Sequence, residues 1–303
     1  MANGITDIAA SVHQRLLNKA KKSSRPFNEL LQYFAIERFI YRISKSPHAD
    51  QFILKGALMF SAWCGPASRP TMDIDLLGKI DNQLDTITAV MKNACLTDVE
   101  PDGMSFNADT VDAGRITEDA EYEGVRVRVH GGLGKARVSI QIDIGFGDVI
   151  VPNAVLVSYP AILDFPAPEL KGYTMESTIA EKFQAMVKLG VLNSRMKDFY
   201  DIWFLSRTFD FKGELLGEAI EKTFEKRSTP VNLDAALFNP SFGIDKDKAV
   251  QWRAFIRKTK LTGVPARFEE IVAAVKLFLE PLVTSIAGQK PFSRIWTAPG
   301  PWL

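Results

Sequence analysis

Two aspartates spaced two residues apart are the clearest chemical signal in this sequence. Asp73 and Asp75 lie in the segment Met72–Leu76, in which apolar and acidic residues alternate. Successive side chains of a β-strand point to opposite faces, so the alternation predicts a strand with both carboxylates on one face. Two like charges about 4 Å apart repel by roughly 1 kcal/mol in water and roughly 4 kcal/mol at an effective dielectric constant of 20. A magnesium ion would offset that repulsion, because it prefers carboxylate and phosphate oxygens.

A third aspartate supports this interpretation. Asp143 lies on the polar side of a second alternating segment, Ala136–Ile144, whose other side consists of valine and isoleucine. Three carboxylates on one side of a sheet can hold two metal ions, or one metal ion and a general base, around a phosphate undergoing transfer. The competing interpretation is that Asp73 and Asp75 face solvent on an edge strand.

A glycine upstream of the carboxylates is suited to phosphate binding. Lys55-Gly56 follows the short apolar segment Phe52–Leu54 and precedes a predicted helix from Ala57 to Trp63. The free backbone N–H groups at the start of a helix attract phosphate, and glycine lets a phosphate approach the backbone closely. The sequence therefore places a candidate phosphate-binding turn before the candidate metal ligands.

The composition argues against several other kinds of site. The 303 residues carry a net charge of +1, so any contact with nucleic acid would need a local basic patch. Cys64 and Cys95 are too few and too far apart for a disulfide framework or a zinc ribbon, and the three histidines lie far from one another in the sequence. Since we find neither a secretory signal nor an apolar run of the roughly 18–20 residues that span a membrane, we expect a cytoplasmic protein with no membrane partner.

Helical and strand patterns occupy different halves of the chain. Two helical patterns come first, a β-rich stretch follows, and helical spacing of apolar residues resumes at Met175. Besides Met72–Leu76, strands are expected near Asp109–Thr117, Val125–His130 and Ala136–Ile144. Pro166, Pro168 and Gly172 mark a break between the halves. We therefore predict an α/β (α+β) fold: a mixed-sheet α/β domain with N-terminal helices at residues 1–165, and a helical domain at 166–303 that completes an active-site cleft.

Five short motifs occur in a defined order. They are Lys55-Gly56-Ala57-Leu58, Arg69–Leu76 (RPTMDIDL), Gln141–Asp148 (QIDIGFGD), Glu181–Ala185 (EKFQA) and Ser194–Asp201 (SRMKDFYD). In this order, over roughly residues 30–210, the chain resembles the AbiEii/AbiGii nucleotidyltransferase toxin family, a branch of the polymerase-β-like nucleotidyltransferase superfamily. The D-x-D pair alone is a weak signal, whereas the R-x-K-D-x-x-D run after an E-K helix is specific.

The resemblance implies roles for the residues of the first three motifs. Asp73 and Asp75 would hold Mg²⁺ or Mn²⁺, and Asp143 would be a third metal ligand or a base. The nucleoside triphosphate would be cradled by Lys55, Gly56 and Ala57, and Thr71 would offer a hydroxyl to a phosphate. Many relatives carry glycine or serine where this chain has Ala57, so one phosphate hydrogen bond is in doubt there.

The last two motifs would supply the opposite side of the site. The resemblance implies that Lys182 contacts the triphosphate and that Asp198 supports Lys182 or the acceptor end of the site. Arg195 and Lys197 would contact the triphosphate or an RNA acceptor. The residues by themselves also allow simpler interpretations: Lys182 as a solvated lysine flanking an apolar stripe, Asp198 as a helix N-cap, and the two basic residues as a solvated helix face.

The resemblance implies an enzyme that transfers a nucleoside monophosphate from a nucleoside triphosphate to an acceptor hydroxyl. A transfer RNA 3′ end is a candidate acceptor, growth arrest or phage defence a candidate outcome, and an antitoxin encoded alongside a candidate partner. Two alternatives stay open: phosphotransfer of the kinase type to a protein, and a catalytically weak module that binds nucleotide or RNA. The retention of every motif carboxylate and of Lys182 favours the enzyme over the weak binder.

Overall fold

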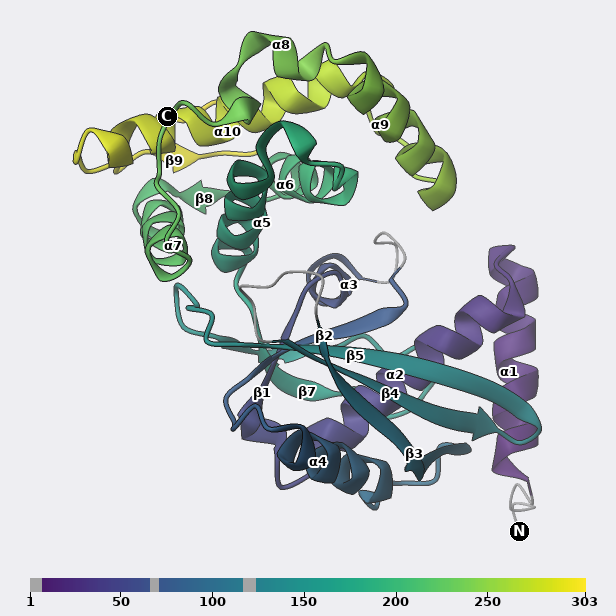
Figure 1. Ribbon diagram of the computed structural model, residues 1–303. Coiled ribbons are helices and arrows are strands. Elements are labelled where there is room, and N and C mark those ends of the chain that lie inside the picture. Colours follow the sequence, from purple (N-terminus) through teal and green to yellow (C-terminus); the bar gives the residue numbers. More distant parts are fainter. Residues whose placement is uncertain (1–6, 66–70, 117–123) are drawn as a thin grey trace. The chain divides into compact units, whose positions relative to one another are not determined.

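The computed structural model describes residues 7–65, 71–116 and 124–303. The chain divides into two compact units (Figure 1). Unit 1 comprises Met1–Gly147 and Val155–Gly172, and unit 2 comprises Asp148–Ala154 and Tyr173–Leu303. Residues 166–172, where the sequence marks a break, lie in unit 1.

Unit 1 is built on a seven-stranded mixed sheet with the strand order β3-β4-β5-β2-β1-β7-β6. The strands are β1 (Phe52–Lys55), β2 (Asp73–Gly78), β3 (Met104–Ile116), β4 (Gly124–Leu133), β5 (Ala136–Phe146), β6 (Val155–Ser158) and β7 (Glu169–Gly172). The pairs β2–β5 and β1–β7 are parallel, and the other neighbouring strands are antiparallel. The α/β class with a mixed sheet is confirmed. The short strands β6 and β7 were not predicted, because four residues are too few to establish an alternating pattern.

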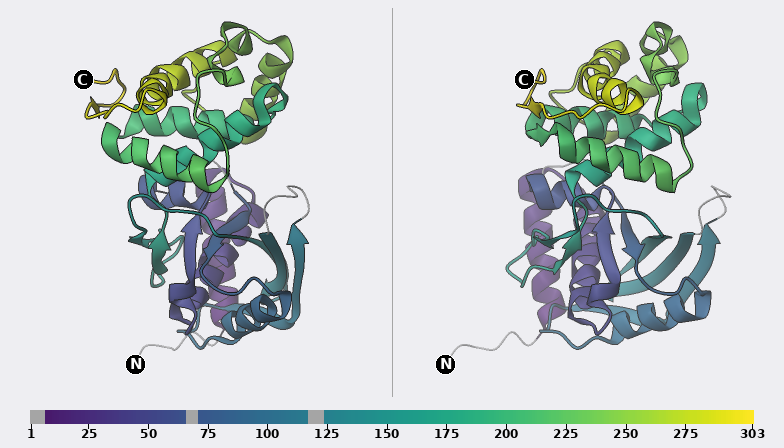
Figure 2. Two further views of the ribbon diagram at one scale, coloured as in Figure 1. Left: turned by 60° about the vertical axis from the view of Figure 1, so that its left-hand side comes forward. Right: turned by 90° about the vertical axis from the view of Figure 1, so that its left-hand side faces the viewer.

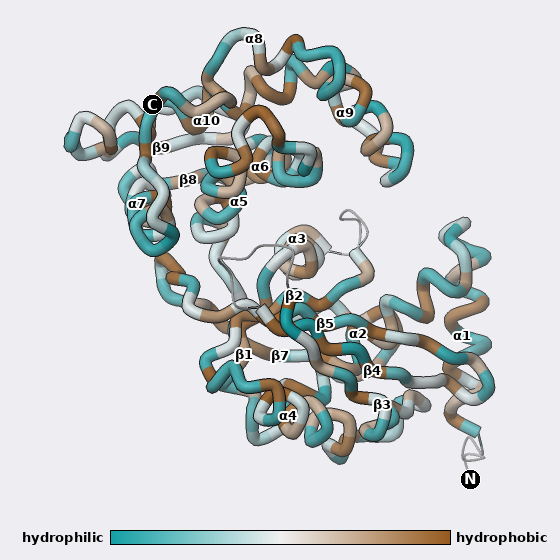
Figure 3. Tube along the Cα trace, in the orientation of Figure 1, coloured by the Kyte–Doolittle hydropathy of each residue, from teal (hydrophilic) through white to brown (hydrophobic). Residues whose placement is uncertain are grey.

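Four helices accompany this sheet: α1 (Ile8–Ser23), α2 (Phe27–Lys45), α3 (Leu58–Cys64) and α4 (Leu84–Leu96), with a short 3-10 turn at Ala49–Gln51. The first begins at Asp7, whose carboxylate accepts a 2.9 Å hydrogen bond from the Ala10 N–H. Polar and apolar residues alternate along α1 and α2 (Figure 3), and the two helices run side by side (Figure 2). The second packs on β5, and α4 packs on β3.

Unit 2 is mainly helical. It contains α5 (Met175–Leu189), α6 (Met196–Thr208), α7 (Gly213–Lys226), α8 (Pro240–Gly243), α9 (Lys246–Thr259) and α10 (Phe268–Ala287), 3-10 turns at Gly190–Leu192 and Ala236–Phe238, and the two-residue strands β8 (Phe211–Lys212) and β9 (Ile295–Trp296). The C-terminal tail is docked, because the indole N–H groups of Trp296 and Trp302 donate to the carbonyls of Ser206 and Phe278. In the described part of the chain, none of the helices is both long enough and apolar enough to cross a membrane.

A buried glutamate in α2 makes the stability of unit 1 depend on pH. Glu37 is 0% exposed, and burial raises its pKa from 4.5 to about 7 although Arg38 and the Ile162 N–H stabilise the carboxylate. The folded state therefore keeps a proton that the unfolded chain releases between these pH values. The free energy of unfolding should fall as pH rises through this window, by roughly 3 kcal/mol.

We expect Glu37→Gln to remove this part of the pH dependence, because the amide stays neutral. Urea unfolding of both proteins between pH 5 and 7.5, followed by circular dichroism, measures the difference in their free energies of unfolding. The exposed carboxylate Glu169 provides the control, and Glu169→Gln should follow the wild type. Parallel curves for Glu37→Gln and the wild type would contradict the expectation.

Candidate active site

The two aspartates of β2 lie on the same face of the sheet, on a strand in its middle. Asp73 and Asp75 are half-buried, while Ile74 and Leu76 between and after them are fully buried. The alternation predicted from the sequence is therefore confirmed for these four residues. Since β2 lies between β5 and β1, the interpretation of an exposed edge strand is wrong.

The third aspartate is brought beside this pair by the parallel pairing of β2 with β5. Asp143 is the Cα partner of Asp75, and Gln141 is the partner of Asp73. On the far side of β5, Arg126 of β4 donates two 2.8 Å hydrogen bonds to the two oxygens of Asp143. Arg126 was missed by sequence reasoning, because only the strand register shows that it faces Asp143. Its guanidinium offsets the charge of one of the three neighbouring carboxylates.

Gly56 is required for the position of the Asp75 carboxylate. It lies directly after β1, and its φ of 68° is in the left-handed region that favours glycine. A Cβ on residue 56 would lie 2.0 Å from Asp75 Oδ2 and 2.6 Å from Asp75 Cγ. Lys55, the residue before it, is the Cα partner of Asp75. The turn thus has a role that was not predicted, which is to leave room for an acidic side chain.

Ala57 and Thr71 complete the predicted residues of unit 1. Ala57 is buried, and Thr71 Oγ1 lies 3.5 Å from the carbonyl oxygen of Asp73, at the long limit of a hydrogen bond. The helix that follows Gly56 spans only seven residues, so its dipole places a small partial positive charge at its N-terminus. Arg69 of the second motif lies outside the described residues.

In unit 2, a lysine bridges two buried carboxylates. Lys182 of α5 lies 2.8 Å from Asp198 Oδ1 and 2.8 Å from Asp201 Oδ2, both on α6. The two aspartate side chains are 0% exposed, and that of Lys182 is 12% exposed. The interpretation of Lys182 as a solvated lysine is therefore wrong. The interpretation of Asp198 as an N-cap is also wrong, because Arg195 occupies the N-cap position of α6.

The two basic residues of the last motif lie at the start of α6. Arg195 is half-exposed, and its Nε forms a 2.7 Å ion pair with Asp198 Oδ2. Lys197 is exposed. The Arg195 backbone N–H donates to the side chain of buried Asn193, whose own carbonyl accepts a 2.9 Å bond from the buried amine of Lys248. Lys248 was also missed, because it lies far along the chain in α9.

A second ion cluster fixes the residue before Lys182. Arg227 of α7 lies 2.9 Å from Asp148 Oδ1 and 3.3 Å from Glu181 Oε1. The Tyr173 hydroxyl donates a 2.9 Å hydrogen bond to Glu181, and burial together with these carboxylates raises the pKa of Tyr173 well above 10. The cluster ties the middle of α5 to α7, so it holds the helix on which Lys182 lies.

The predicted site residues thus form two groups. Unit 1 brings together Lys55, Gly56, Asp73, Asp75 and Asp143, and unit 2 brings together Lys182, Arg195 and Asp198. Across the described residues, no group of three or more histidine, cysteine, aspartate or glutamate side chains has the geometry of a metal site. Asp143 is held by Arg126, and the Asp73–Asp75 pair supplies carboxylate oxygens, which are the ligands that Mg²⁺ prefers.

We expect Gly56→Ala to lower stability and activity by more than the cost of placing an alanine in the left-handed backbone region. The new Cβ must displace Asp75, and a left-handed alanine costs about 1–2 kcal/mol. Gly65→Ala is a matched control, because Gly65 also has positive φ but a Cβ there would meet no atom within 4 Å. Thermal melting and any activity that depends on Asp75 should both fall further for Gly56→Ala. Equal losses for the two variants would contradict a role in positioning Asp75.

Comparison with known proteins gives one family match. The family described as nucleotidyl transferase AbiEii toxin, type IV toxin–antitoxin system, matches residues 38–274, which is more than half of the chain. No curated protein sequence matches at a significant level.

Two crystal structures from Helicobacter pylori are similar. One, described as that of a candidate nucleotidyltransferase, has 14% identity and a TM-score of 0.46, covering 86% of this chain and 97% of that chain. The other, that of JHP933, has 14% identity and a TM-score of 0.44, covering 94% of this chain and 96% of that chain.

Proposed function

The chain belongs to the AbiEii nucleotidyl transferase toxin family, and from this premise we propose that it transfers a nucleoside monophosphate from a nucleoside triphosphate to a hydroxyl of an RNA acceptor. The observation that carries the proposal is the Asp73–Asp75 pair on the central strand β2, with the Gly56 turn packed against Asp75. All of these residues lie within the matched segment. The family makes the protein a nucleotidyltransferase; the acceptor and the metal are our proposal.

Asp73 and Asp75 are proposed to hold Mg²⁺ or Mn²⁺. Their chemistry fits, because both are half-buried carboxylates on one strand face, and Mg²⁺ takes one or two protein carboxylates and completes its shell with water and phosphate. When bound, the ion would supply Lewis-acid stabilisation of charge on the phosphate oxygens. Asp143, held by Arg126, is proposed as a third carboxylate that orients or deprotonates the acceptor hydroxyl.

The Gly56 turn is proposed to hold the triphosphate, together with its neighbours Lys55, Ala57 and Thr71. Lys55 brings a positive charge to the row that contains Asp75, and Gly56 exposes backbone N–H groups without a side chain. Ala57 contributes a backbone N–H and no hydroxyl. This division of roles keeps the phosphates on the β1 side of the carboxylates.

Lys182 is proposed to bind the triphosphate from unit 2. Its ammonium group is oriented by Asp198 and Asp201, so we propose that it is held in place to attract a phosphate oxygen. Arg195 and Lys197 lie at the exposed start of α6 and would add positive charge for the triphosphate or an RNA. That the helical unit contributes these residues to the active site is part of this proposal.

The biological setting is proposed from the family description. A toxin of a type IV system acts against its own cell, so we propose that a 3′-terminal hydroxyl of transfer RNA is the acceptor and that an antitoxin gene product counteracts the enzyme in the cytoplasm. Growth arrest would follow from loss of usable transfer RNA, and phage defence is one use of such an arrest.

The test follows the label from the donor. The protein is incubated with Mg²⁺, total RNA and each α-³²P nucleoside triphosphate in turn, and the products are separated on a denaturing gel. We expect one RNA band to gain label from the α-phosphate and none from the γ-phosphate. Transfer of γ-label to a protein would indicate a kinase-type reaction instead. Nucleotide binding without any labelled product would contradict nucleotidyl transfer to RNA.

A further inference from the structure

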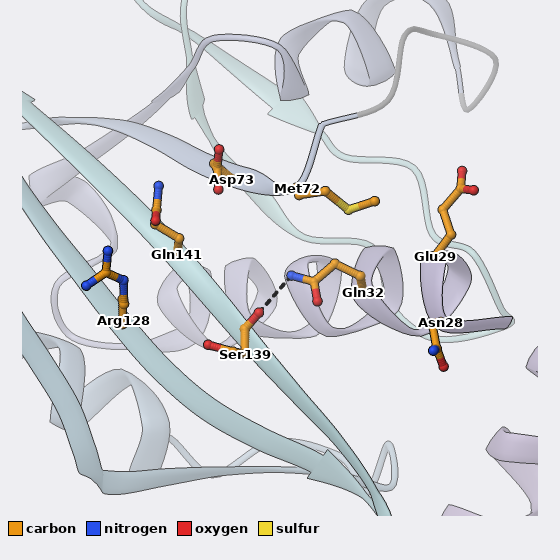
Figure 4. A pocket seen from close by; sticks show the side chains of 8 residues that line it. All are labelled: Asn28, Glu29, Gln32, Met72, Asp73, Arg128, Ser139 and Gln141. Carbon is orange, nitrogen blue, oxygen red and sulfur yellow. Dashed lines mark hydrogen bonds between the residues drawn. The ribbon is translucent and has the colours of Figure 1, made fainter. Parts of the chain in front are cut away.

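A cavity of about 490 Å³ lies beside Asp73 within unit 1 (Figure 4). It is bounded by the first turns of α2 and by strands β2, β4 and β5. Its volume is within the range of about 300–1,000 Å³ that small-molecule sites occupy. No role proposed above uses the cavity except through Asp73, which forms part of its wall.

The cavity lies beside the first residue of β2 that pairs with β5. In the described residues, β2 pairs with β5 only from Asp73 opposite Gln141 onward, although β5 begins at Ala136. The first turns of α2 lie next to this edge, and the Gln32 amide donates a 2.9 Å bond to the Ser139 carbonyl. Met72 was expected on the buried side of the strand but is 43% exposed, and in Figure 4 its side chain extends from the start of β2 toward α2.

The lining favours a neutral, planar, polar ligand over a phosphate. It contains the amides of Asn28, Gln32 and Gln141, and among the described residues no hydrogen bond engages the side chains of Asn28 and Gln141. The charged groups are the carboxylates of Glu29 and Asp73 and the guanidinium of Arg128, so the lining offers no excess of positive charge to a phosphate. Asparagine and glutamine amides match the donor–acceptor edges of nucleobases.

Two further residues of the lining, Met72 and Arg128, are suited to pack on the faces of such a ring. Met72 offers a polarisable apolar surface, and the exposed Arg128 offers a guanidinium plane of the kind on which unstacked RNA bases pack. Arg128 is the Cα partner of Gln141, which is the partner of Asp73. A base held by this row would therefore lie beside Asp73, on the face that carries the carboxylates.

The position of the cavity distinguishes the acceptor from the donor. In the strand order β4-β5-β2-β1, the Gly56 turn follows β1 on one side of Asp75, whereas Gln141 and Arg128 lie on the other side of β2. If the Gly56 turn holds the donor triphosphate, the carboxylates lie between donor and cavity. We propose that the cavity binds the terminal nucleoside of the RNA acceptor, an inference that rests on the proposed function and names its acceptor subsite.

The test measures RNA binding without any transfer step. The probe is a 5′-fluorescein, single-stranded RNA of ten nucleotides, with either a normal 3′-terminal nucleoside or a 3′-terminal ribose that lacks its base; fluorescence anisotropy gives the Kd of each. The pocket variants are Gln141→Leu and Arg128→Met. Arg137→Met is the matched control, because Arg137 is an exposed arginine on the same face of β5 outside the cavity.

For the wild type and Arg137→Met, we expect loss of the terminal base to weaken binding about 10-fold, as stacking and edge contacts with one base predict. For both pocket variants we expect the intact RNA to bind as weakly as the RNA without the base. Equal affinity of the wild type for both RNAs, no binding at all, or unchanged discrimination in the pocket variants would overturn the inference.

Two outcomes separate this inference from the proposed function and from a donor site. Base discrimination by the wild type without labelled product in the transfer assay would support the subsite and contradict nucleotidyl transfer. Affinity for the four nucleoside triphosphates, measured by calorimetry, should be unchanged in the pocket variants. If instead the pocket variants lose nucleoside triphosphate affinity and keep RNA discrimination, the donor base occupies the cavity and the acceptor assignment is wrong.

Discussion

Asp75→Asn is expected to lower nucleotidyl transfer by about 10³-fold or more, because a metal-binding carboxylate supports several kcal/mol of transition-state stabilisation and each 1.36 kcal/mol is tenfold in rate. Asparagine has the size of aspartate, so its contact with Gly56 is kept. The variant should therefore fold normally and lose activity through its charge alone. Initial rates of α-³²P incorporation into RNA, at saturating Mg²⁺, measure the loss.

The control for this variant is Asp81→Asn, which neutralises an exposed carboxylate soon after β2. It should retain nearly full activity, and both proteins should melt within a few degrees of the wild type. Asp73→Asn should behave like Asp75→Asn if the two residues share an ion. Retention of more than a tenth of the activity by Asp75→Asn in folded protein would remove Asp75 from the proposed metal site.

Lys182→Met is expected to destabilise unit 2 by about 3–5 kcal/mol, because it leaves two buried carboxylates without the cation that joins them. It should also abolish transfer at temperatures where the protein stays folded, since the proposed contact with the triphosphate is lost. Urea unfolding followed by tryptophan fluorescence reports on unit 2, which contains four of the five tryptophans, namely Trp203, Trp252, Trp296 and Trp302.

A surface ion pair supplies the comparison. Lys222 pairs with Glu218 on α7 and is half-exposed, so Lys222→Met should cost at most about 1 kcal/mol. Adding Asp201→Asn to Lys182→Met should restore part of the stability, because one buried charge is removed, but should not restore activity. A small stability loss in Lys182→Met with full activity would mean that the lysine is neither structural nor functional.

Local patterns in the sequence were sufficient to place the carboxylates on one face. A strand repeats every two residues, so the alternation of Asp73 and Asp75 with Ile74 and Leu76 determines which side chains share a face, whatever the strand pairs with. The same reasoning correctly placed Asp143 on the polar face of its own strand. The order of the five motifs indicated the family, which the match to residues 38–274 confirms.

Local patterns did not determine which strand lies next to which. Asp75 and Asp143 are neighbours because β2 pairs in parallel with β5, and Arg126 faces Asp143 because β4 pairs with β5 on the other side. These partners depend on the topology of the whole sheet, and hydrophobic periodicity contains no information about it. Met72 illustrates the same limit, because its exposure depends on where β2 starts relative to β5.

The site formed by Lys182, Asp198 and Asp201 shows most clearly what the sequence determined and what only the tertiary structure decided. The spacing of Asp198 and Asp201 is that of neighbours on a helix, so the sequence allowed both to lie on one side of a helix but did not decide between this and an N-cap role for Asp198. Only the packing of α5 against α6 decided that Lys182 bridges them in a buried position, and the distant Lys248 helps to hold the backbone before them. The physical reason is that a charge is buried only where its partners are supplied, and here the cation comes from the preceding helix, α5, which the spacing of the aspartates does not reveal.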